Sequence, residues 1–160
     1  MTDRLWAPWR AELFSDPKPE GCIFCKFPAE GAASDEKNYL VHRGEKCFVI
    51  LNKYPYTAGH LMVIPFAHID DPAVMAPLAA EMFALSAKSM SALTAIMRPD
   101  GFNLGMNLGR AAGAGVPGHG HLHVVPRWAG DNNFMPVLAE RRVISEGLAE
   151  CWTRLKPHFA

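Results

Sequence analysis

The fold is decided by the stretch Gly118-His119-Gly120-His121-Leu122-His123-Val124-Val125-Pro126-Arg127-Trp128, which holds three of the seven histidines at strict two-residue spacing. Successive side chains of a strand point to opposite faces, so one extended strand would present all three imidazoles on one surface. The alternating residues Gly120, Leu122 and Val124 would face the other side, where aliphatic groups can enter a core and glycine permits close approach. We therefore predict a strand with a chemical face and a packing face.

A structural or solvated role is the usual one for a single histidine, and a histidine run can be a purification tag. Tags are terminal and uninterrupted, whereas this row is internal, alternates with small and aliphatic residues, and ends at Pro126. The row therefore favours a chemical role. Neutral imidazole can attack phosphorus, and neighbouring imidazoles can hold the attacking ring in one tautomer and bind phosphate oxygens. The spacing alone indicates a histidine row that meets an anionic or metal-bound substrate.

Length and composition indicate a single domain with tails. A chain of 160 residues with 49% hydrophobic content can bury one core, and sixteen basic residues balance sixteen acidic ones. This balance argues against a nucleic-acid partner, and no apolar run reaches the roughly 20 residues of a membrane span. Because the N-terminus has no signal-peptide pattern, we expect a cytoplasmic protein without a membrane partner.

Apolar patterning and turn residues predict the regular elements. Asp70-Asp71-Pro72 begins a helix whose apolar spacing continues from Val74 to Met97, with Pro77 near enough to the start to allow a break. A tail helix is expected from Ile144 to Leu155. Strands are expected at 39–43 and 46–52, joined by a tight turn at Gly44-Glu45, at 60–66, around 101–109, and at the histidine row. The fold class is therefore α+β, with an antiparallel sheet of about five strands and a long crossover helix.

The chain divides into an arm, a domain and a tail. Residues 1–20 hold Trp6 and Trp9 ahead of a proline-rich and glycine-rich linker, residues 21–135 form the domain, and residues 136–160 form a partly helical tail. The arm can bury its tryptophans on its own core or on a second subunit. Because an arm ahead of a linker can reach across an interface, we favour the second subunit and expect a homodimer.

Cys22 and Cys25 form a close Cys-x-x-Cys pair in a predicted turn, and the polar segment 29–38 that follows is expected to be a surface loop. In a reducing compartment such a pair is a redox centre, two buried thiols, or half of a zinc site. His68 follows a strand end and His119 heads the histidine row, so a Cys2His2 ligand set is available to zinc. The other two cysteines and the helix methionines are expected to be packing residues.

The motif HGHLHVV resembles the histidine triad, His-x-His-x-His followed by two apolar residues, of the histidine triad nucleotide-binding proteins. Gly120 stands where the motif has its first bulky residue. The resemblance covers most of the chain and is strongest in LWAPWR, CIFC, LNKYPYTAGHLMVIP, GFNLGMNLG and PRWAGDNNFMPV. The last of these segments resembles the bacterial branch related to diadenosine tetraphosphate phosphorylases.

The resemblance implies roles for particular residues. His121, the middle histidine, would be the nucleophile that takes up a nucleoside monophosphate, and His123, His119 and His60 would be the other catalytic histidines. The implied nucleotide-binding residues are Ile50 at the base, Asn52 at the ribose, and Asn107 with Gly113, Ala114 and Gly115 at the phosphates. In zinc-binding relatives the metal ligands correspond to Cys22, Cys25, His68 and His119. An asparagine at a turn or strand end is the alternative for Asn52 and Asn107.

The leading hypothesis is an enzyme that cleaves dinucleoside polyphosphates of the diadenosine tetraphosphate type through a nucleotidyl-histidine intermediate. Its partner is a purine nucleotide and its cofactor a structural zinc ion. Many similar proteins carry a polar pair such as Gln-Ser, which handles the leaving group, where this chain has Gly115 and Val116. This difference affects which leaving group the site serves, and it does not affect the attack by His121. The alternatives are a nucleoside phosphoramidate hydrolase and a non-catalytic nucleotide-binding dimer.

Overall fold

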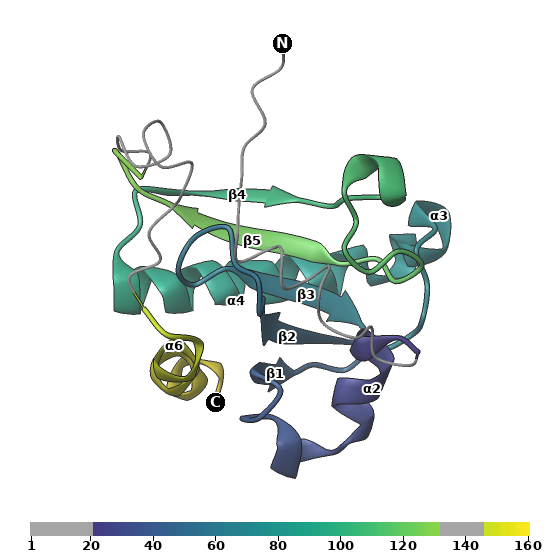
Figure 1. The fold of residues 1–160 in the computed structure, drawn as a ribbon, viewed down its shortest axis with the longest axis horizontal. Helices are drawn as coiled ribbons and strands as arrows, with labels where there is room; N and C mark the ends of the chain where they lie inside the picture. The colour runs from purple at the N-terminus through teal and green to yellow at the C-terminus, as the bar shows by residue number, and fades with distance from the viewer. Residues whose placement is uncertain (1–20, 132–145) are drawn as a thin grey trace.

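Five strands form one antiparallel sheet in the order β1-β2-β3-β5-β4 (Figure 1). The structure is a computed structural model that describes residues 21–131 and 146–160. The strands are β1 (Leu40–Arg43), β2 (Cys47–Leu51), β3 (Leu61–Pro65), β4 (Gly101–Gly105) and β5 (Leu122–Arg127). The predicted α+β fold with about five antiparallel strands is confirmed. The tryptophans of the arm and the first residues of the predicted tail lie outside the described residues.

Four α-helices accompany the sheet in the described residues: α2 (Ile23–Ala29), α3 (Pro72–Met75), α4 (Ala79–Met97) and α6 (Leu148–Leu155). Single 3-10 turns lie at Ala32–Ser34, Ala76–Leu78, Arg110–Ala112 and Lys156–Phe159. The predicted start of the tail helix, Ile144, is outside the described residues. In the parts of the chain that the structure describes, no helix is long and apolar enough to cross a membrane. The cytoplasmic location stays a prediction.

The long crossover helix is interrupted at Pro77, where its sequence allows a break. Asp71 caps α3, because its side chain accepts the backbone N–H of Ala73 at 2.8 Å, and Pro72 occupies the first turn. Pro77 has no N–H to donate, and the chain forms a 3-10 turn there before α4 begins. The helix ends at Met97, after which Arg98 takes a left-handed conformation. The helix predicted to reach Met97 is therefore confirmed, with the break at Pro77.

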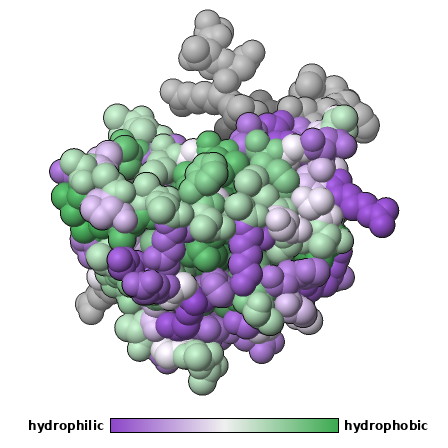
Figure 2. Space-filling model, turned by 180° about the vertical axis from the view of Figure 1, so that it is seen from behind, coloured by the Kyte–Doolittle hydropathy of each residue, from purple (hydrophilic) through white to green (hydrophobic). Residues whose placement is uncertain are grey.

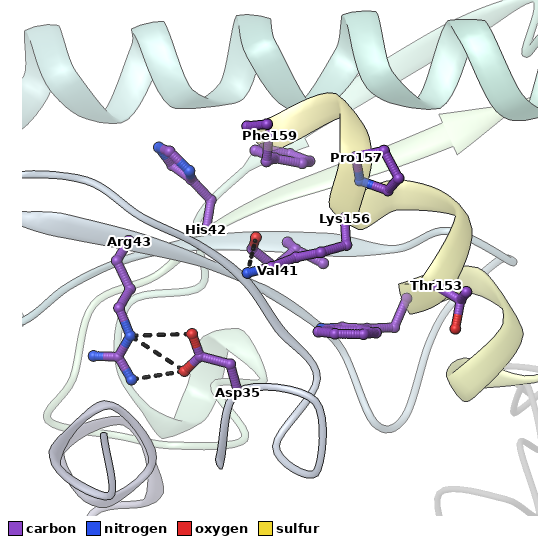
Figure 3. Close-up of a pocket in the computed structure, with 10 residues that line it drawn as sticks. Asp35, Val41, His42, Arg43, Thr153, Lys156, Pro157 and Phe159 are labelled. Carbon is purple, nitrogen blue, oxygen red and sulfur yellow. Dashed lines mark hydrogen bonds and ion pairs between the residues drawn. The ribbon is translucent and has the colours of Figure 1, made fainter. Parts of the chain in front are cut away.

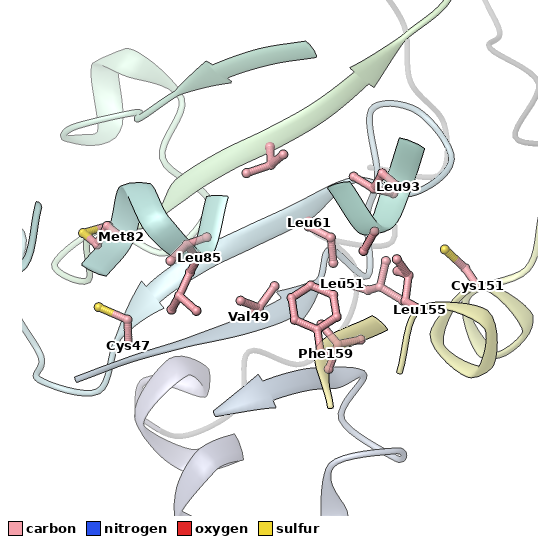
Figure 4. Close-up of a cluster of buried hydrophobic side chains, with 14 of the residues drawn as sticks. Cys47, Val49, Leu51, Leu61, Met82, Leu85, Leu93, Cys151, Leu155 and Phe159 are labelled. Atoms are coloured by element: carbon pink, nitrogen blue, oxygen red, sulfur yellow. The ribbon is translucent and has the colours of Figure 1, made fainter. Parts of the chain in front are cut away.

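The main core lies between one face of the sheet and the helices α4 and α6 (Figure 4). Cys47 and Cys151 are buried in it, and burial raises the pKa of each thiol to about 12, so both are packing residues as predicted. The remaining buried members are Val41, Val49, Leu51, Leu61, Val63, Met75, Met82, Leu85, Ala92, Leu93, Val124, Leu155 and Phe159. Val124 is thus on the packing face predicted for the histidine stretch.

A smaller core lies on the opposite face, where α2 packs through Phe24 against side chains that alternate with those of the main core. Its other buried members are Leu40, Phe48, Ile50, Met62 and Ile64. Because Met62 pairs with His123 across β3 and β5, the histidine side chains share this second face. The division into a packing face and a chemical face is therefore as predicted.

Two segments differ from their predictions. The Cys-x-x-Cys segment is not a turn, because Cys22 is the N-cap of α2 and Cys25 lies in its first turn. The polar segment 29–38 is not simply a surface loop, because Asp35 is only 7% exposed. Its carboxylate accepts from Nη2 of Arg43 at 2.7 Å, and this ion pair offsets the cost of burying the charge.

Candidate active site and metal site

His60 and His123 are joined by a hydrogen bond whose direction follows from the surrounding chain. Nδ1 of His60 accepts the backbone N–H of Tyr56 at 3.1 Å, so the proton of the neutral ring is on Nε2. Nε2 of His60 then donates to Nδ1 of His123 at 2.9 Å. His123 therefore carries its own proton on Nε2, where it can donate to a further acceptor.

His121 is held in the opposite tautomer. Its Nδ1 is 2.9 Å from the backbone oxygen of His119, and since a carbonyl only accepts, the ring proton is on Nδ1. Nε2 of His121 therefore carries a lone pair. Burial lowers the pKa of His121, and the bond to the His119 oxygen opposes this less strongly, so the ring is neutral near pH 7. The centroids of the His121 and His123 rings are 4.8 Å apart, so a nucleophilic nitrogen and an N–H donor are neighbours.

His119 belongs to a different cluster. Its Nε2–H donates to the backbone oxygen of Pro65 at 2.8 Å, which leaves the lone pair on Nδ1. Nδ1 lies 3.3 Å from Sγ of Cys22 and 3.6 Å from Sγ of Cys25. Burial lowers the pKa of His119, although the Pro65 bond opposes the shift, so this lone pair is available near pH 7.

The expectation of one strand through the whole histidine row is therefore wrong. Strand β5 begins only at Leu122, because the backbone N–H of Gly120 donates to the oxygen of Ile69 at 2.7 Å and not to a neighbouring strand. Gly118, with φ of 85°, turns the chain just before the row. The turn and the Ile69 bond let His119 reach the cysteines.

Cys22, Cys25, His68 and His119 bring one ligand atom each to within 4.8 Å of one another. Sγ of Cys25 is 3.4 Å from Nδ1 of His68. Zinc bonds of about 2.3 Å to sulfur and about 2.0 Å to nitrogen would place the ligand atoms of a tetrahedral site roughly 3.5 Å apart. The three sulfur–nitrogen distances of 3.3, 3.4 and 3.6 Å match this spacing. The bond from His119 to Pro65 is also of the kind that orients a metal-bound imidazole. The four residues fit a zinc ion.

Residues 34–130 match the HIT domain family. This chain belongs to the HIT family. The HIT protein named AP-4-A phosphorylase from Mycobacterium tuberculosis is 37% identical over 98% of this chain and 84% of its own length. Membership of the HIT family and the similarity to this relative both support a nucleotide-processing enzyme.

Solved HIT structures share the fold. A zinc-bound histidine triad family protein from Mycobacterium smegmatis superposes with a TM-score of 0.68 at 29% identity, over 87% of this chain and 93% of that one. A HIT family protein from Bacillus anthracis gives a TM-score of 0.60 at 34% identity, over 69% and 76% of the two chains.

Of the residues predicted to bind nucleotide, the structure places Ile50 and Asn52 beside the histidines. Ile50 is buried on the histidine face of β2. Asn52 follows that strand, and its side-chain nitrogen is 3.3 Å from Nδ1 of His60. Asn107 follows β4 and is half-buried. The mostly exposed glycine-rich segment 113–115 precedes His119 in the chain, and its role in phosphate binding stays a prediction.

Two aromatic residues contact the histidines and were not singled out from the sequence. The Tyr56 ring is 4.6 Å from the His60 ring and 5.7 Å from the His123 ring, between centroids. The Phe24 ring packs edge-on against His121 at 5.1 Å. Their sequence positions offered a signal, since Tyr56 precedes His60 by four residues and Phe24 lies between the two cysteines.

A cavity of about 550 Å³ lies elsewhere, between the edge strand β1 and the tail (Figure 3). Its polar groups bond within the protein. Nζ of Lys156 donates to the oxygen of Val41 at 3.0 Å, and Nε1 of Trp152 donates to the oxygen of Leu40 at 3.0 Å. These bonds cover backbone acceptors of an edge strand that would otherwise invite pairing with another chain. The cavity therefore lies where the tail packs on β1, and strands β2 and β3 separate β1 from the triad strand β5.

Proposed function

We propose that this HIT protein transfers a nucleoside monophosphate from a dinucleoside polyphosphate, of the diadenosine tetraphosphate type, through a covalent nucleotidyl-His121 intermediate. The observation that carries the proposal is the pairing of opposite tautomers: His121 offers a lone pair on Nε2, and His123 offers a proton on Nε2. The similarity to an AP-4-A phosphorylase supports the choice of substrate class.

The chemistry takes two displacements at one phosphorus atom. Nε2 of His121 attacks the phosphorus that bears one nucleoside, so a P–N bond forms and the P–O bond to the remaining polyphosphate breaks. The His121 ring then carries a positive charge, which the His119 carbonyl stabilises through the Nδ1–H bond. Phosphate or water attacks next, the P–N bond breaks, and His121 is regenerated. His123 donates to a phosphate oxygen in both steps.

The nucleotide would lie on the histidine face of the sheet. Ile50 would contact the base and Asn52 the ribose hydroxyls. Asn107 and the backbone N–H groups of 113–115 would contact the phosphates, because the loop carries almost no side chains that could block access to its amides. Gly115 and Val116 supply no polar side chain toward a leaving group, which suits a polyphosphate that departs as a stable anion without protonation.

Zinc would be held by Cys22, Cys25, His68 and His119 as a structural ion. When bound, it supplies two thiolate and two imidazole bonds that join the start of the domain to the histidine stretch. Burial raises the pKa of the Cys25 thiol, and Cys22 beside it adds to the rise. A bound zinc ion would oppose this rise by favouring the thiolate. The nucleophile His121 lies outside the four-residue set.

The protein would act as a homodimer. Strand β4 is an edge of the sheet, and Leu104 on it is 38% exposed. An exposed edge strand has backbone groups ready to pair with a second chain, and a two-fold axis would pair it with its own copy. We propose this edge as the dimer contact, with the arm of residues 1–20 extending the interface.

Product analysis with diadenosine tetraphosphate, with and without inorganic phosphate, tests the activity. ADP plus ATP in the presence of phosphate means phosphorolysis, and AMP plus ATP means hydrolysis. Either result supports the proposal. Cleavage of a nucleoside phosphoramidate alone would favour the hydrolase alternative, and nucleotide binding without any product would favour a non-catalytic dimer.

A further inference from the structure

The turn between β2 and β3 places Tyr56 against both members of the His60–His123 pair. Its backbone N–H donates to Nδ1 of His60 at 3.1 Å, and its ring packs at a tilt of 39° over the His60 ring. The same ring lies at 35° to the His123 ring. One residue therefore contacts the acceptor atom of the first imidazole and a ring surface of both.

The turn is anchored to three strands, which fixes the main chain of Tyr56. The backbone N–H of Asn52, after β2, donates to the oxygen of His60 at 2.9 Å, and its side-chain oxygen accepts the N–H of Tyr54 at 2.9 Å. Thr57 donates its hydroxyl to the oxygen of Pro126 on β5 at 3.0 Å. These bonds hold the 53–59 segment across the strands that carry the histidines.

The tautomers of the pair need such support. The two neutral tautomers of an imidazole are close in energy, so a neighbouring hydrogen bond decides between them. Water near the pair would offer donors and acceptors to either nitrogen and would allow both forms. His60 is fully buried, and the Tyr56 ring covers it together with His123. A flat ring in this position excludes water and keeps the imidazoles in register.

We propose that Tyr56 is a positioning residue, whose ring holds His123 against the Nε2–H of His60 and so in the tautomer that presents the Nε2 proton of His123 to the phosphate. This inference rests on the proposed function for its purpose, and it extends that function to a residue that touches the histidine pair and not the reacting atoms. Tyr56→Leu removes the aromatic ring while retaining an apolar side chain and the backbone N–H. Tyr56→Phe keeps the ring and is the matched control.

The first measurement is long-range ¹H–¹⁵N NMR of the imidazoles in protein labelled at histidine. In the native protein and in Tyr56→Phe, His60 and His123 should each show the Nε2–H tautomer. In Tyr56→Leu, His123 should show mixed tautomers, because water can then replace the His60 donor at its Nδ1. His60 should keep Nε2–H through the retained backbone N–H of residue 56, and backbone carbonyl groups should keep Nδ1–H on His121 and Nε2–H on His119. Unchanged tautomers in a folded Tyr56→Leu protein would overturn the proposal, whether or not the protein cleaves any substrate.

The second measurement is steady-state kinetics with diadenosine tetraphosphate. Tyr56→Leu should lower kcat by about tenfold to a hundredfold with little change in KM, since a misplaced catalytic group costs rate and not binding. Tyr56→Phe should keep kcat within about twofold. A higher KM at unchanged kcat would make Tyr56 a substrate contact, and a Tyr56→Phe defect equal to that of Tyr56→Leu would assign the effect to the hydroxyl. Both results contradict the proposal.

Discussion

Gly120 lies so close to Met75 that a Cβ atom on residue 120 would be 2.5 Å from Sδ of Met75. The same atom would be 3.3 Å from the oxygen of Ile69, which also accepts the N–H of Gly120. Helix α3 therefore packs directly on the backbone between His119 and His121. The triad motif has a bulky residue where this chain has Gly120. The thioether of Met75 occupies the space that such a side chain would fill.

This contact predicts a coupling between the two positions. Gly120→Ala should destabilise the protein by about 1–3 kcal/mol, because the added methyl group displaces Met75 and approaches the Ile69 carbonyl. In a Met75→Ala background the same change should cost less by about 1 kcal/mol, since the methionine is gone. Urea unfolding of the two single variants and the double variant measures the coupling. Equal costs of Gly120→Ala in both backgrounds would show that the contact does not matter.

The metal site predicts a joint loss of zinc and stability. Purified protein should carry about one zinc per chain, and Cys22→Ser should lower metal content and thermal midpoint together, because zinc binds only the folded state. Activity should fall less than stability, since His121 remains able to react.

The buried Cys151 thiol is not part of the ligand set, so Cys151→Ala should lower the midpoint through lost packing and keep the metal. Elemental analysis and thermal unfolding measure both properties. If native protein prepared without chelators contains no zinc, the metal site is ruled out, and Cys22 and Cys25 are ordinary thiols.

His42 predicts part of the acid sensitivity of the fold. Burial lowers the pKa of His42, Lys88 and Lys156 lower it further, and the Phe159 carbonyl and Glu81 oppose the shift. Below the unfolded value of about 6.5 the unfolded chain binds more protons, so this contribution to stability is lost as the pH falls through that value. His42→Gln should therefore lose less stability than the native protein between roughly pH 7.5 and pH 5.

Urea unfolding at the two pH values checks the His42 prediction. His158→Gln is the matched control, because His158 is exposed and lies in the tail segment whose Phe159 ring packs against His42. If His42→Gln and the control lose stability alike on acidification, His42 has no part in the acid sensitivity.

The β4 edge predicts which surface variants change the mass in solution. Light scattering at micromolar concentration should give a dimer, and Leu104→Glu should shift it toward the monomer by placing charges of one sign across the two-fold contact. Phe83→Glu is the matched control. Phe83 is 66% exposed on α4, whose outward surface is largely apolar (Figure 2). A monomer in the native protein, or dissociation only by Phe83→Glu, would rule out the β4 contact.

Local patterning was enough to predict the sheet and the crossover helix. The strands predicted at 39–43 and 46–52 are Leu40–Arg43 and Cys47–Leu51, because alternating or continuous apolar runs bounded by turn residues need little tertiary information. The proximity of Cys22, Cys25, His68 and His119 was also anticipated, although these residues are far apart in the sequence.

The features that the sequence did not predict depend on contacts that residue patterns do not reveal. The start of β5 depends on the bond from Gly120 to Ile69, and residue spacing around the histidines does not reveal that partner. Asp35 was expected at the surface because the polar segment around it gives no sign that Arg43 would pair with it. Tyr56 lies in a turn without periodicity, and its spacing of four residues from His60 does not show that its ring contacts both His60 and His123.

The most direct test of the account is to trap the nucleotide on His121. Protein mixed with diadenosine tetraphosphate is quenched at alkaline pH, where a phosphoramidate survives, and the tryptic peptide between Arg110 and Arg127 is sequenced by mass spectrometry. We predict one adenylate, attached to His121 and lost on acid treatment, and no adduct or turnover in His121→Ala, which still binds nucleotide. An adenylate on another residue, or His121→Ala protein that keeps most of the native turnover, would contradict the covalent mechanism.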